Sequence, residues 1–503
     1  MAEPTELPLF PGPNLSPALV LDLRRMNPWW TGHSLPVLPP TRRHLVGEMH
    51  RRLDLRLAPA LLVRGPRQVG KTTAQLQLLA DLLARGVPPR NILRLQADEL
   101  PALTEVKEPL LRVVDWYESA VLGSTLNDAA RRGEPTYLFF DEVQNVDDWA
   151  PQLNSLVDHA TTQVVAAGSA ALRIELGRDS LAGRISTLEA GPLSLTEIGA
   201  FRGLDLGAPF LSDDGLEPLG AAEFWRDLGE HGRTLAAARD QAFRWFSERG
   251  GYPLAHQRTA ADWAYVADQL NETVIRRVIQ HDLRRGESGQ RRDAALLAEM
   301  FRLACRYAGQ APRPDALARE ARRALGANLG SNRVRQYLRF LGDSLLLRLV
   351  KPLEIRLKAS RGSDKICLSD HGLRASWLQE VVPLDAAELE RQPQLLPLAG
   401  RLAASVAGAA LSTIPNLDLS HLPGRPGEPE VDFVLTLGAR RIPLAVRYQR
   451  RLDPLADTEG LRTFLEKSVN HAPFGLLITQ AGAETVADPR IVCLPLATLL
   501  LLR

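Results

Sequence analysis

A glycine-containing loop between a short apolar run and a helical pattern constrains the fold of this chain most strongly. Residues 65–72 read GPRQVGKT, which fits the spacing G-x-x-x-x-G-K-[ST]. The apolar run at residues 60–63 predicts a strand buried on both faces, and residues 71–85 predict a helix. Glycines let backbone N–H groups turn inward, and a helix N-terminus adds partial positive charge. The loop is therefore predicted to hold phosphate groups.

We expect the whole loop and the first residues of the helix to bind the phosphates of ATP. The predicted nucleotide-binding residues are Gly65, Pro66, Arg67, Gln68, Val69, Gly70, Lys71, Thr72 and Thr73. Lys71 is placed to reach the β- and γ-phosphates and to act in catalysis there, while the Thr72 hydroxyl is placed to ligate Mg²⁺.

A second predicted strand, at residues 136–140, ends in two acidic residues about seventy positions after the loop. Ligands bind at the carboxyl ends of strands in open α/β sheets. Asp141 is expected to hold the Mg²⁺ shell, and Glu142 to orient and deprotonate the attacking water. An exposed acidic strand end with no role is the simpler alternative.

Short apolar runs alternate with helical patterns over the first two hundred residues, which predicts an α/β fold with a parallel sheet covered on both faces. The predicted strands are residues 60–63, 91–95, 136–140, 163–167 and 188–193. The strand at 91–95 lies between the two motifs, which favours the P-loop ATPases that use a catalytic glutamate.

Two further positions near these strands are candidates for the site. Ser169 follows the fourth strand and is predicted to sense the γ-phosphate, with a simple turn as the alternative. Arg184 is a candidate catalytic arginine finger, acting in trans from a neighbouring subunit or in cis, with a surface arginine as the alternative.

The chain resembles prokaryotic AAA-type ATPases that carry a conserved C-terminal domain of unknown function. The resemblance rests on NPWW at 27–30, GPRQVGKTT at 65–73, FDEVQ at 140–144, GS at 168–169, LAGR at 181–184, GPLS at 191–194, GYP at 251–253, SDHGL at 369–373 and EVDF at 430–433. It implies an AAA-like core, a winged-helix middle and a C-terminal domain similar to restriction endonucleases. For members of this family, association with defence, mobile elements or toxin–antitoxin pairs is implied.

The predicted organisation has five parts. They are an N-terminal extended arm (1–48) that packs through its tryptophans, an AAA-like P-loop domain (49–204), a helical lid or linker (205–256), a winged-helix-type domain (257–375) and a C-terminal α/β nuclease-like domain (376–503).

A basic segment lies within the predicted winged-helix part. Residues 276–351 contain 17 Arg and Lys against 7 Asp and Glu, so this segment carries +10 and the rest of the chain −8. Arg333, Arg335 and Arg339 would be spaced along one helix, which in a helix-turn-helix enters the major groove. The segment is therefore a candidate for contacting DNA phosphates. Packing against another protein, with solvated arginines, is the alternative.

The C-terminal domain departs from the nuclease pattern. A restriction-type nuclease needs a carboxylate on one strand and Glu/Asp-x-Lys on the next to hold Mg²⁺. Asp432 suits the first position, but the second strand reads Ala445-Val446-Arg447, and the upstream helix has Ala403 and Ala404. We therefore expect a degenerate domain that binds a partner or DNA, and nuclease activity is not expected.

The main expectation is an ATP-hydrolysing, Mg²⁺-dependent switch or motor that couples its nucleotide state to DNA or to a protein partner. The alternatives are a DNA-binding module whose ATP site controls assembly, and a nuclease effector. A homo-oligomer follows if Arg184 acts in trans. With no apolar run near the ~20 residues of a membrane helix and no secretory signal pattern, we expect no membrane partner and a cytoplasmic location.

Overall fold

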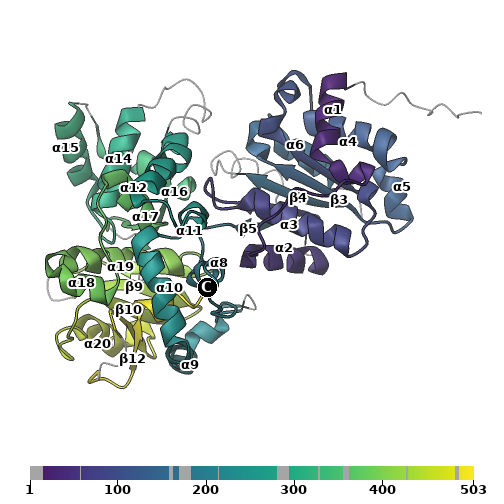
Figure 1. The fold of residues 1–503 in the computed structure, drawn as a ribbon. Coiled ribbons are helices and arrows are strands. Elements are labelled where there is room, and N and C mark those ends of the chain that lie inside the picture. The colour runs from purple at the N-terminus through teal and green to yellow at the C-terminus, as the bar shows by residue number, and fades with distance from the viewer. Residues whose placement is uncertain are drawn as a thin grey trace, which may run out of the picture. The chain divides into compact units, whose positions relative to one another are not determined.

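The chain forms two compact units, Met1–Ala190 and Gly191–Arg503 (Figure 1). The computed structural model describes residues 15–56, 58–157, 162–168, 183–212, 215–279, 294–326, 329–354, 362–425, 429–481 and 486–503. The unit boundary falls inside the predicted P-loop domain (49–204), and the finer division into five parts stays a prediction.

The described part of the first unit contains a five-stranded parallel sheet in the order β2-β3-β4-β1-β5. The strands are β1 (Ala60–Arg64), β2 (Ile92–Gln96), β3 (Thr136–Asp141), β4 (Thr162–Gly168) and β5 (Ile185–Glu189). Every residue of β4 is buried, as expected for a strand covered on both faces. The predicted fold class is confirmed, and the strand predicted between the two motifs is β2.

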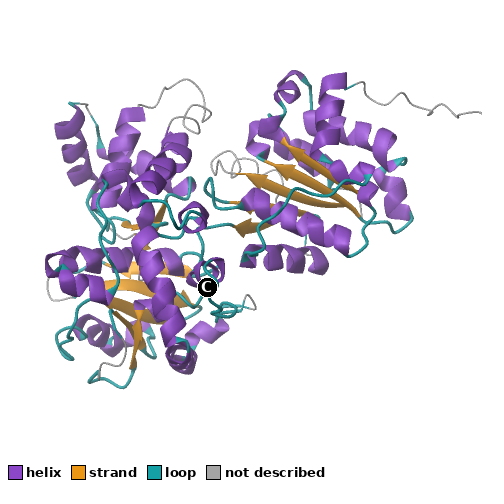
Figure 2. Ribbon diagram, in the orientation of Figure 1, coloured by secondary structure: helices purple, strands orange, loops and turns teal. Residues whose placement is uncertain are grey.

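Helices cover both faces of this sheet (Figure 2). Helices α2 (His44–Leu55) and α3 (Lys71–Ala84) lie on one face, and α1 (Pro17–Met26), α4 (Pro109–Tyr117) and α6 (Trp149–Leu156) lie on the other. A shorter helix, α5 (Leu126–Arg131), and a π-helical turn, Glu118–Leu122, complete this region. Apolar side chains of α1, α4 and α6 pack on Leu62 and Val164 of the sheet in one core cluster.

The N-terminal arm is not extended as predicted, because residues Pro17–Met26 form helix α1. Its tryptophans do pack on the first unit. Strand β2 is an edge strand, and Asn27 pairs with the Arg94 backbone by accepting from its N–H (2.7 Å) and donating to its carbonyl (2.8 Å). The indole N–H groups of Trp29 and Trp30 both donate to the Ile92 carbonyl. The motif at 27–30 thus satisfies the free backbone groups of an edge strand.

The second unit begins with a helical region and continues into a mixed part. Its helices are α8 (Leu195–Phe201), α9 (Ala222–Thr234), α10 (Ala236–Arg249), α11 (Pro253–Gln257), α12 (Trp263–Leu270), α14 (Ala294–Arg306), α15 (Pro314–Leu325), α16 (Ser331–Asp343), α17 (His371–Leu378), α18 (Ala386–Arg391), α19 (Leu396–Leu411), α20 (Glu459–Glu466) and α21 (Leu496–Leu499). Its strands are β6 (Leu347–Pro352), β7 (Lys365–Leu368), β8 (Asp418–Leu422), β9 (Val431–Leu437), β10 (Arg440–Arg447), β11 (Gly475–Thr479) and β12 (Ile491–Pro495).

The described strands of this unit form one sheet in the order β12-β11-β10-β9-β8-β6-β7. Strands β6 and β7 are an antiparallel pair that follows α14, α15 and α16, and Gln310 adds an isolated antiparallel bridge to Ile366 of β7. Strand β6 also pairs with β8, so the hairpin continues into the C-terminal strands.

Helix α19 is the main apolar helix of the second unit. Together with the turn before it, Pro393–Leu411, it is long and apolar enough to cross a membrane by length and composition, which the sequence analysis did not anticipate. It packs against β7 and β10, and Ala403 and Ala404 are buried there. Its apolar character therefore fits a core helix.

Two motifs of the second unit, GYP at 251–253 and SDHGL at 369–373, meet at a buried carboxylate. Asp370, which caps α17, accepts from the backbone N–H groups of Gly251 and Gly372. A Cβ on Gly250 would lie 2.1 Å from the same carboxylate, and the φ of Gly250 is +72°. The turn after α10 therefore requires glycine, and the Asp370 carboxylate holds this turn against α17.

Candidate functional site

The loop at residues 65–70 connects the carboxyl end of β1 to the first turn of α3. A Cβ on Gly65 would lie 2.2 Å from the Ala190 carbonyl oxygen, so no side chain fits at this position. Gly70 has a φ of +91° and Gln68 a φ of +63°, which turn the backbone sharply twice. Pro66 and Val69 are buried, while the Gln68 side chain is exposed. The loop is thus a backbone cradle at a helix N-terminus.

Lys71, the first residue of α3, points its side chain into this cradle. Its ammonium donates hydrogen bonds to the carbonyls of Gly65 (3.0 Å) and Pro66 (2.7 Å), and the residue is buried. A positive charge is therefore held inside the loop. Arg43, just before α2, donates to the Val69 carbonyl (2.6 Å) and adds a second cation beside the loop; the sequence analysis assigned it no role.

Thr72 and Asp141, the two predicted Mg²⁺ ligands, are in direct contact. The Thr72 hydroxyl donates to Oδ2 of Asp141 at 2.6 Å. They come from different elements, since Thr72 lies in the first turn of α3 and Asp141 is the last residue of β3. Strand β4 lies between β1 and β3 in the sheet, so both residues stand at the same, carboxyl edge.

The Asp141 carboxyl is completely buried, and this burial raises its pKa. The Thr72 hydrogen bond lowers that pKa, the Glu142 charge raises it, and the charges of Lys71 and Arg94 lower it. The net effect is a carboxylate that is costly to ionise unless a further cation is near it.

Glu142 turns away from the strand. Its φ is +53°, an uncommon value for a non-glycine residue, and its N–H donates to Oδ1 of Asp141 at 3.0 Å. The buried Gln144 donates from its side-chain amide to the Glu142 carboxylate at 2.5 Å. Gln144 is a candidate site residue that the sequence analysis missed, although its place two residues after the acidic pair could have suggested it.

The structure describes some of the remaining predicted site residues and not others. Arg67 and Thr73 are partly buried in and after the loop. Ser169 lies outside the described residues, but Gly168 before it ends β4 and pairs with Arg64 of β1, between the two motifs.

Arg184 stands at the opposite end of β1 from the loop. Its carbonyl accepts from the N–H of Ala60, and its guanidinium donates to Asn154 of α6 at 2.8 Å. Five strand residues at ~3.3 Å each separate this end of β1 from Gly65, farther than an arginine side chain extends. The cis alternative for the arginine finger is therefore wrong, and the trans alternative stays a prediction.

The backbone N–H groups and side chains of this site fit a nucleoside triphosphate with Mg²⁺. The cradle that excludes a Cβ at Gly65 leaves backbone N–H groups and Lys71 as the contacts for phosphate oxygens. The Thr72 hydroxyl and the Asp141 carboxylate are the oxygen ligands that Mg²⁺ prefers. Residues 58–199 match the family model described as an AAA domain. This part of the chain is an AAA-type P-loop ATPase domain.

A second family model, a domain of unknown function (DUF8612), matches residues 240–383, downstream of the ATPase domain. Uncharacterized proteins of Mycobacterium tuberculosis and Mycobacterium bovis are each 25% identical over 349 residues, which cover 68% of this chain. The same stretch spans 61% of the length of those relatives.

Two solved structures are similar to parts of the chain. The Walker-type ATPase PABY2304 of Pyrococcus abyssi is 15% identical, with a TM-score of 0.41, and the match covers 68% of this chain and 99% of that one. Domain III of the replication initiation protein DnaA of Thermotoga maritima is 14% identical, with a TM-score of 0.22, and the match covers 33% and 70%.

Proposed function

We propose that this protein binds ATP and hydrolyses it with Mg²⁺, and that the cycle switches the state of the second unit. The observation that carries the proposal is the contact between Thr72 and Asp141 beside Lys71. These are the groups that a phosphoryl-transfer site needs for the metal and for the phosphates, and they converge at one edge of the sheet.

Each residue has a distinct role in this proposal. Loop N–H groups and Lys71 bind the β- and γ-phosphates, and Lys71 exchanges its bonds to loop carbonyls for bonds to phosphate oxygens. Thr72 and Asp141 hold Mg²⁺, which neutralises charge on the phosphates when it is bound. Glu142 accepts the proton of the attacking water, and Gln144 orients its carboxylate.

The test is ATP turnover and ATP affinity of Lys71→Ala and Glu142→Gln, with Lys107→Ala as control because Lys107 is an exposed lysine of the same unit. We expect Lys71→Ala to lose affinity and turnover. Glu142→Gln is expected to keep affinity and to lose roughly 10²–10⁴-fold in turnover. Turnover equal to the unmodified protein in both variants would reject the proposal.

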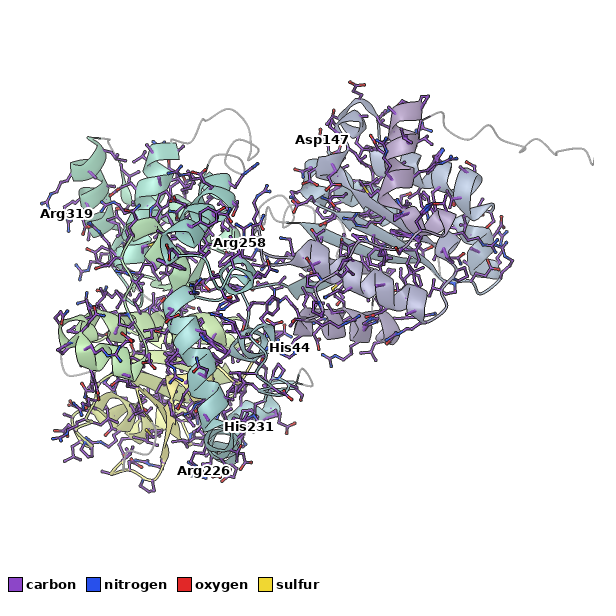
Figure 3. The ribbon with its side chains drawn as sticks, viewed as in Figure 1. His44, Asp147, Arg226, His231, Arg258 and Arg319 are labelled. Carbon is purple, nitrogen blue, oxygen red and sulfur yellow. The ribbon has the colours of Figure 1, made fainter. Side chains whose placement is uncertain are left out.

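A second candidate function is duplex DNA binding by the part that contains α14, α15, α16 and the β6–β7 hairpin. Three helices followed by an antiparallel hairpin, with Gln310 bridged to β7, support a winged helix. On α16 the apolar face is buried, whereas Arg333, Arg335 and Arg339 are exposed. Arg319 on α15 also extends outward (Figure 3).

This candidate is tested by neutralising Arg333 and Arg335 to Gln. If both arginines contact phosphates, the affinity for duplex DNA falls. The negative slope of the logarithm of the association constant against the logarithm of the salt concentration becomes shallower by about 1 per residue. Arg226→Gln is the control, because this exposed arginine belongs to α9, apart from the three helices (Figure 3). Absence of binding by the unmodified protein at low salt would reject DNA as the partner.

The remaining expectations are proposals as well. A homo-oligomer in which Arg184 completes the site of a neighbouring chain predicts an ATP-dependent increase in molecular mass and reduced turnover in Arg184→Ala. An unchanged mass with ATP and full turnover in that variant would argue against it. A protein partner, a cytoplasmic location and a role in defence or toxin–antitoxin systems rest on the sequence and its resemblance.

A further inference from the structure

The nuclease resemblance implies metal ligands on two neighbouring C-terminal strands, but the described side chains at these positions make other contacts. Asp432 of β9 faces Arg447 of β10, as the sequence predicts for the two motif positions. Ala445 is buried in an apolar cluster with Val434 and Leu461. Among the described residues, no group of three His, Cys, Asp or Glu side chains is arranged to hold a metal ion.

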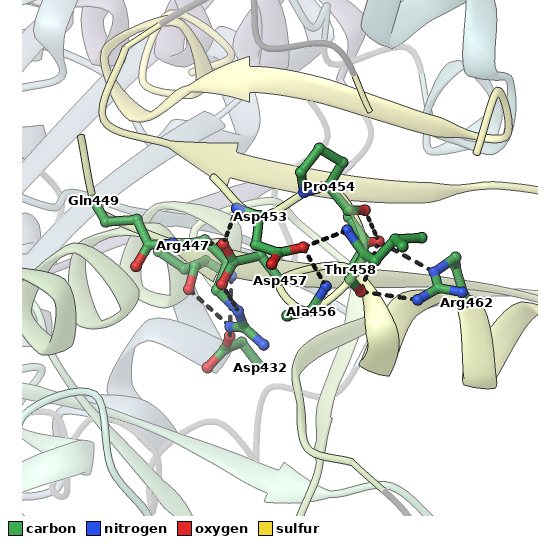
Figure 4. A network of polar contacts seen from close by, with 11 residues as sticks. Asp432, Arg447, Gln449, Asp453, Pro454, Ala456, Asp457, Thr458 and Arg462 are labelled. Carbon is green, nitrogen blue, oxygen red and sulfur yellow. Dashed lines mark hydrogen bonds and ion pairs between the residues drawn. The ribbon is translucent and has the colours of Figure 1, made fainter. Parts of the chain in front are cut away.

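Both oxygens of the Asp432 carboxylate have partners. Oδ2 accepts from the Val446 N–H (2.9 Å) and from the Arg447 guanidinium (3.2 Å), which also lies 3.9 Å from Asp457 (Figure 4). Oδ1 accepts from the ammonium of Lys365 at 2.7 Å. The carboxylate therefore has a cation on each side.

Lys365 reaches this site from β7, 67 residues earlier in the sequence. Its side chain is 1% exposed, and its ammonium is surrounded by oxygens: Oδ1 of Asp432 at 2.7 Å, Oε1 of Glu430 at 3.0 Å and the Asp432 carbonyl at 3.3 Å. Two carboxylates and a backbone carbonyl are the ligand types that hard divalent cations use. The ammonium thus occupies an oxygen-lined cation position.

The charge balance keeps Lys365 protonated. Burial lowers its pKa, but the charges and hydrogen bonds of Asp432 and Glu430 outweigh burial and raise it overall. For Asp432, burial raises the pKa, whereas Lys365 and Arg447 lower it, and the net shift is downward. A divalent ion entering here would have to displace a buried ammonium and lie beside Arg447, both of which are electrostatically unfavourable.

We propose that the Lys365 ammonium takes the place of the divalent cation between Glu430 and Asp432. The Mg²⁺ that the nuclease resemblance implies does not fit these residues, and the C-terminal domain is independent of metal. The internal cation joins strand β7 to strand β9, so this position serves as an ionic link between the hairpin and the C-terminal strands.

Solvent reaches the carboxylates around Lys365. A cleft of about 540 Å³ lies beside the cluster, and Glu430, Asp432, Arg447 and His421 line it. A small ion from solvent can therefore reach these carboxylates if the cation position is vacated.

The experiment measures Mn²⁺ bound per chain by electron paramagnetic resonance, without nucleotide. The unmodified protein and Asp432→Asn are expected to bind the same number of ions. Lys365→Met, which removes the charge and keeps the length, is expected to gain one ion, and adding Asp432→Asn to it removes that gain. Lys351→Met, at an exposed lysine of β6, is the control and should gain none.

Either of two results would overturn the proposal: loss of one Mn²⁺ on Asp432→Asn in the otherwise unmodified protein, or no gain in a folded Lys365→Met. If circular dichroism shows that Lys365→Met is unfolded, the comparison of the unmodified protein with Asp432→Asn still decides. Equal Mn²⁺ counts in that pair support the internal cation, and unequal counts reject it. These results do not depend on the ATP site.

Discussion

In the proposed mechanism, single side chains at the phosphate loop carry the chemistry because they hold charge where solvent is excluded. Lys71 and Asp141 are both buried, and each has hydrogen-bonding partners within the chain. Glu142 is only partly buried, and the amide of Gln144 orients its carboxylate.

Asp141→Asn should raise the stability of the protein and lower its ATP turnover. Because the pKa of Asp141 is raised in the folded protein, the unfolded chain loses this proton at lower pH than the folded one. The free energy of unfolding therefore falls as pH rises from the ordinary pKa to the raised one, and it stays lower above that window. We expect the Asn variant, free of nucleotide and Mg²⁺ at neutral pH, to melt at a higher temperature.

The same variant should lose Mg²⁺-dependent ATP turnover by roughly 10²–10³-fold, because an amide binds the metal poorly. Calorimetry and a turnover assay check the two halves. A variant that melts lower than the unmodified protein would contradict the proposed cost of the buried charge.

Gln144→Ala should lower turnover and leave ATP affinity unchanged, since Gln144 donates to the carboxylate of Glu142, whose proposed role is in hydrolysis and not in ATP binding. Loss of one hydrogen bond to a charged group corresponds to ~1.5–3 kcal/mol, or about 10–150-fold in rate. Steady-state kinetics with separate ATP-binding titrations measure both quantities. Equal losses of ATP affinity and turnover would instead indicate a general disruption of the loop. Gln144→Glu is a control: an ionised carboxylate cannot donate a hydrogen bond to Glu142, so this variant should not have the rate of the unmodified protein.

Some strands and turns depend on hydrogen bonds from side chains that lie outside them. Strand β2 is an edge strand, and Asn27 with two tryptophans completes its hydrogen bonding. In the second unit, Asp370 fastens the turn after α10 to α17 in a similar way. Short polar residues thus hold backbone groups that neither a helix nor a sheet satisfies.

Asn27→Ala should destabilise the first unit by about 2–4 kcal/mol, because it leaves a buried N–H and a buried carbonyl of Arg94 without partners. Urea unfolding of the full chain measures this change. Asn127→Ala, at an exposed asparagine of α5, is the matched control and should remain within ~0.5 kcal/mol of the unmodified protein. A similar change in the two variants would remove the edge-strand explanation.

The stability of the complete chain should depend on pH through its buried histidines. Burial lowers the pKa of His256 to about 4, although its hydrogen bond to the Gly250 carbonyl opposes this shift. Between pH 6.5 and about 4 the unfolded chain binds a proton that the folded chain does not. The free energy of unfolding therefore falls as pH falls through this window, by on the order of 3 kcal/mol from His256.

His256→Gln, which keeps a donor for the Gly250 carbonyl, should show a shallower loss over the same pH range in urea titrations. His371, whose pKa burial also lowers, stays in the variant and leaves part of the dependence. Identical pH profiles for the variant and the unmodified protein would show that His256 does not titrate as described.

Local sequence patterns were sufficient for the phosphate loop and for the first sheet. The run at 60–63, the glycine spacing and the helix after it lie within some twenty-five residues, and each follows from short-range periodicity and backbone freedom. The acidic pair was recognisable because a buried strand ends there. Arg184 is the exception: the sequence left open whether it acts in cis or in trans, and only the pairing of β5 with β1 places it at the end of β1 opposite the loop.

Contacts between distant segments emerged only from the folded chain. The contact of Asn27 with the Arg94 backbone and the position of Lys365 between Glu430 and Asp432 depend on how distant segments pack. Hydrophobic periodicity specifies which face of an element is buried, but it does not specify the neighbour on that face. A lysine 67 residues before its carboxylate partner carries no local mark of that pairing, because burial and charge compensation arise only once the strands have assembled.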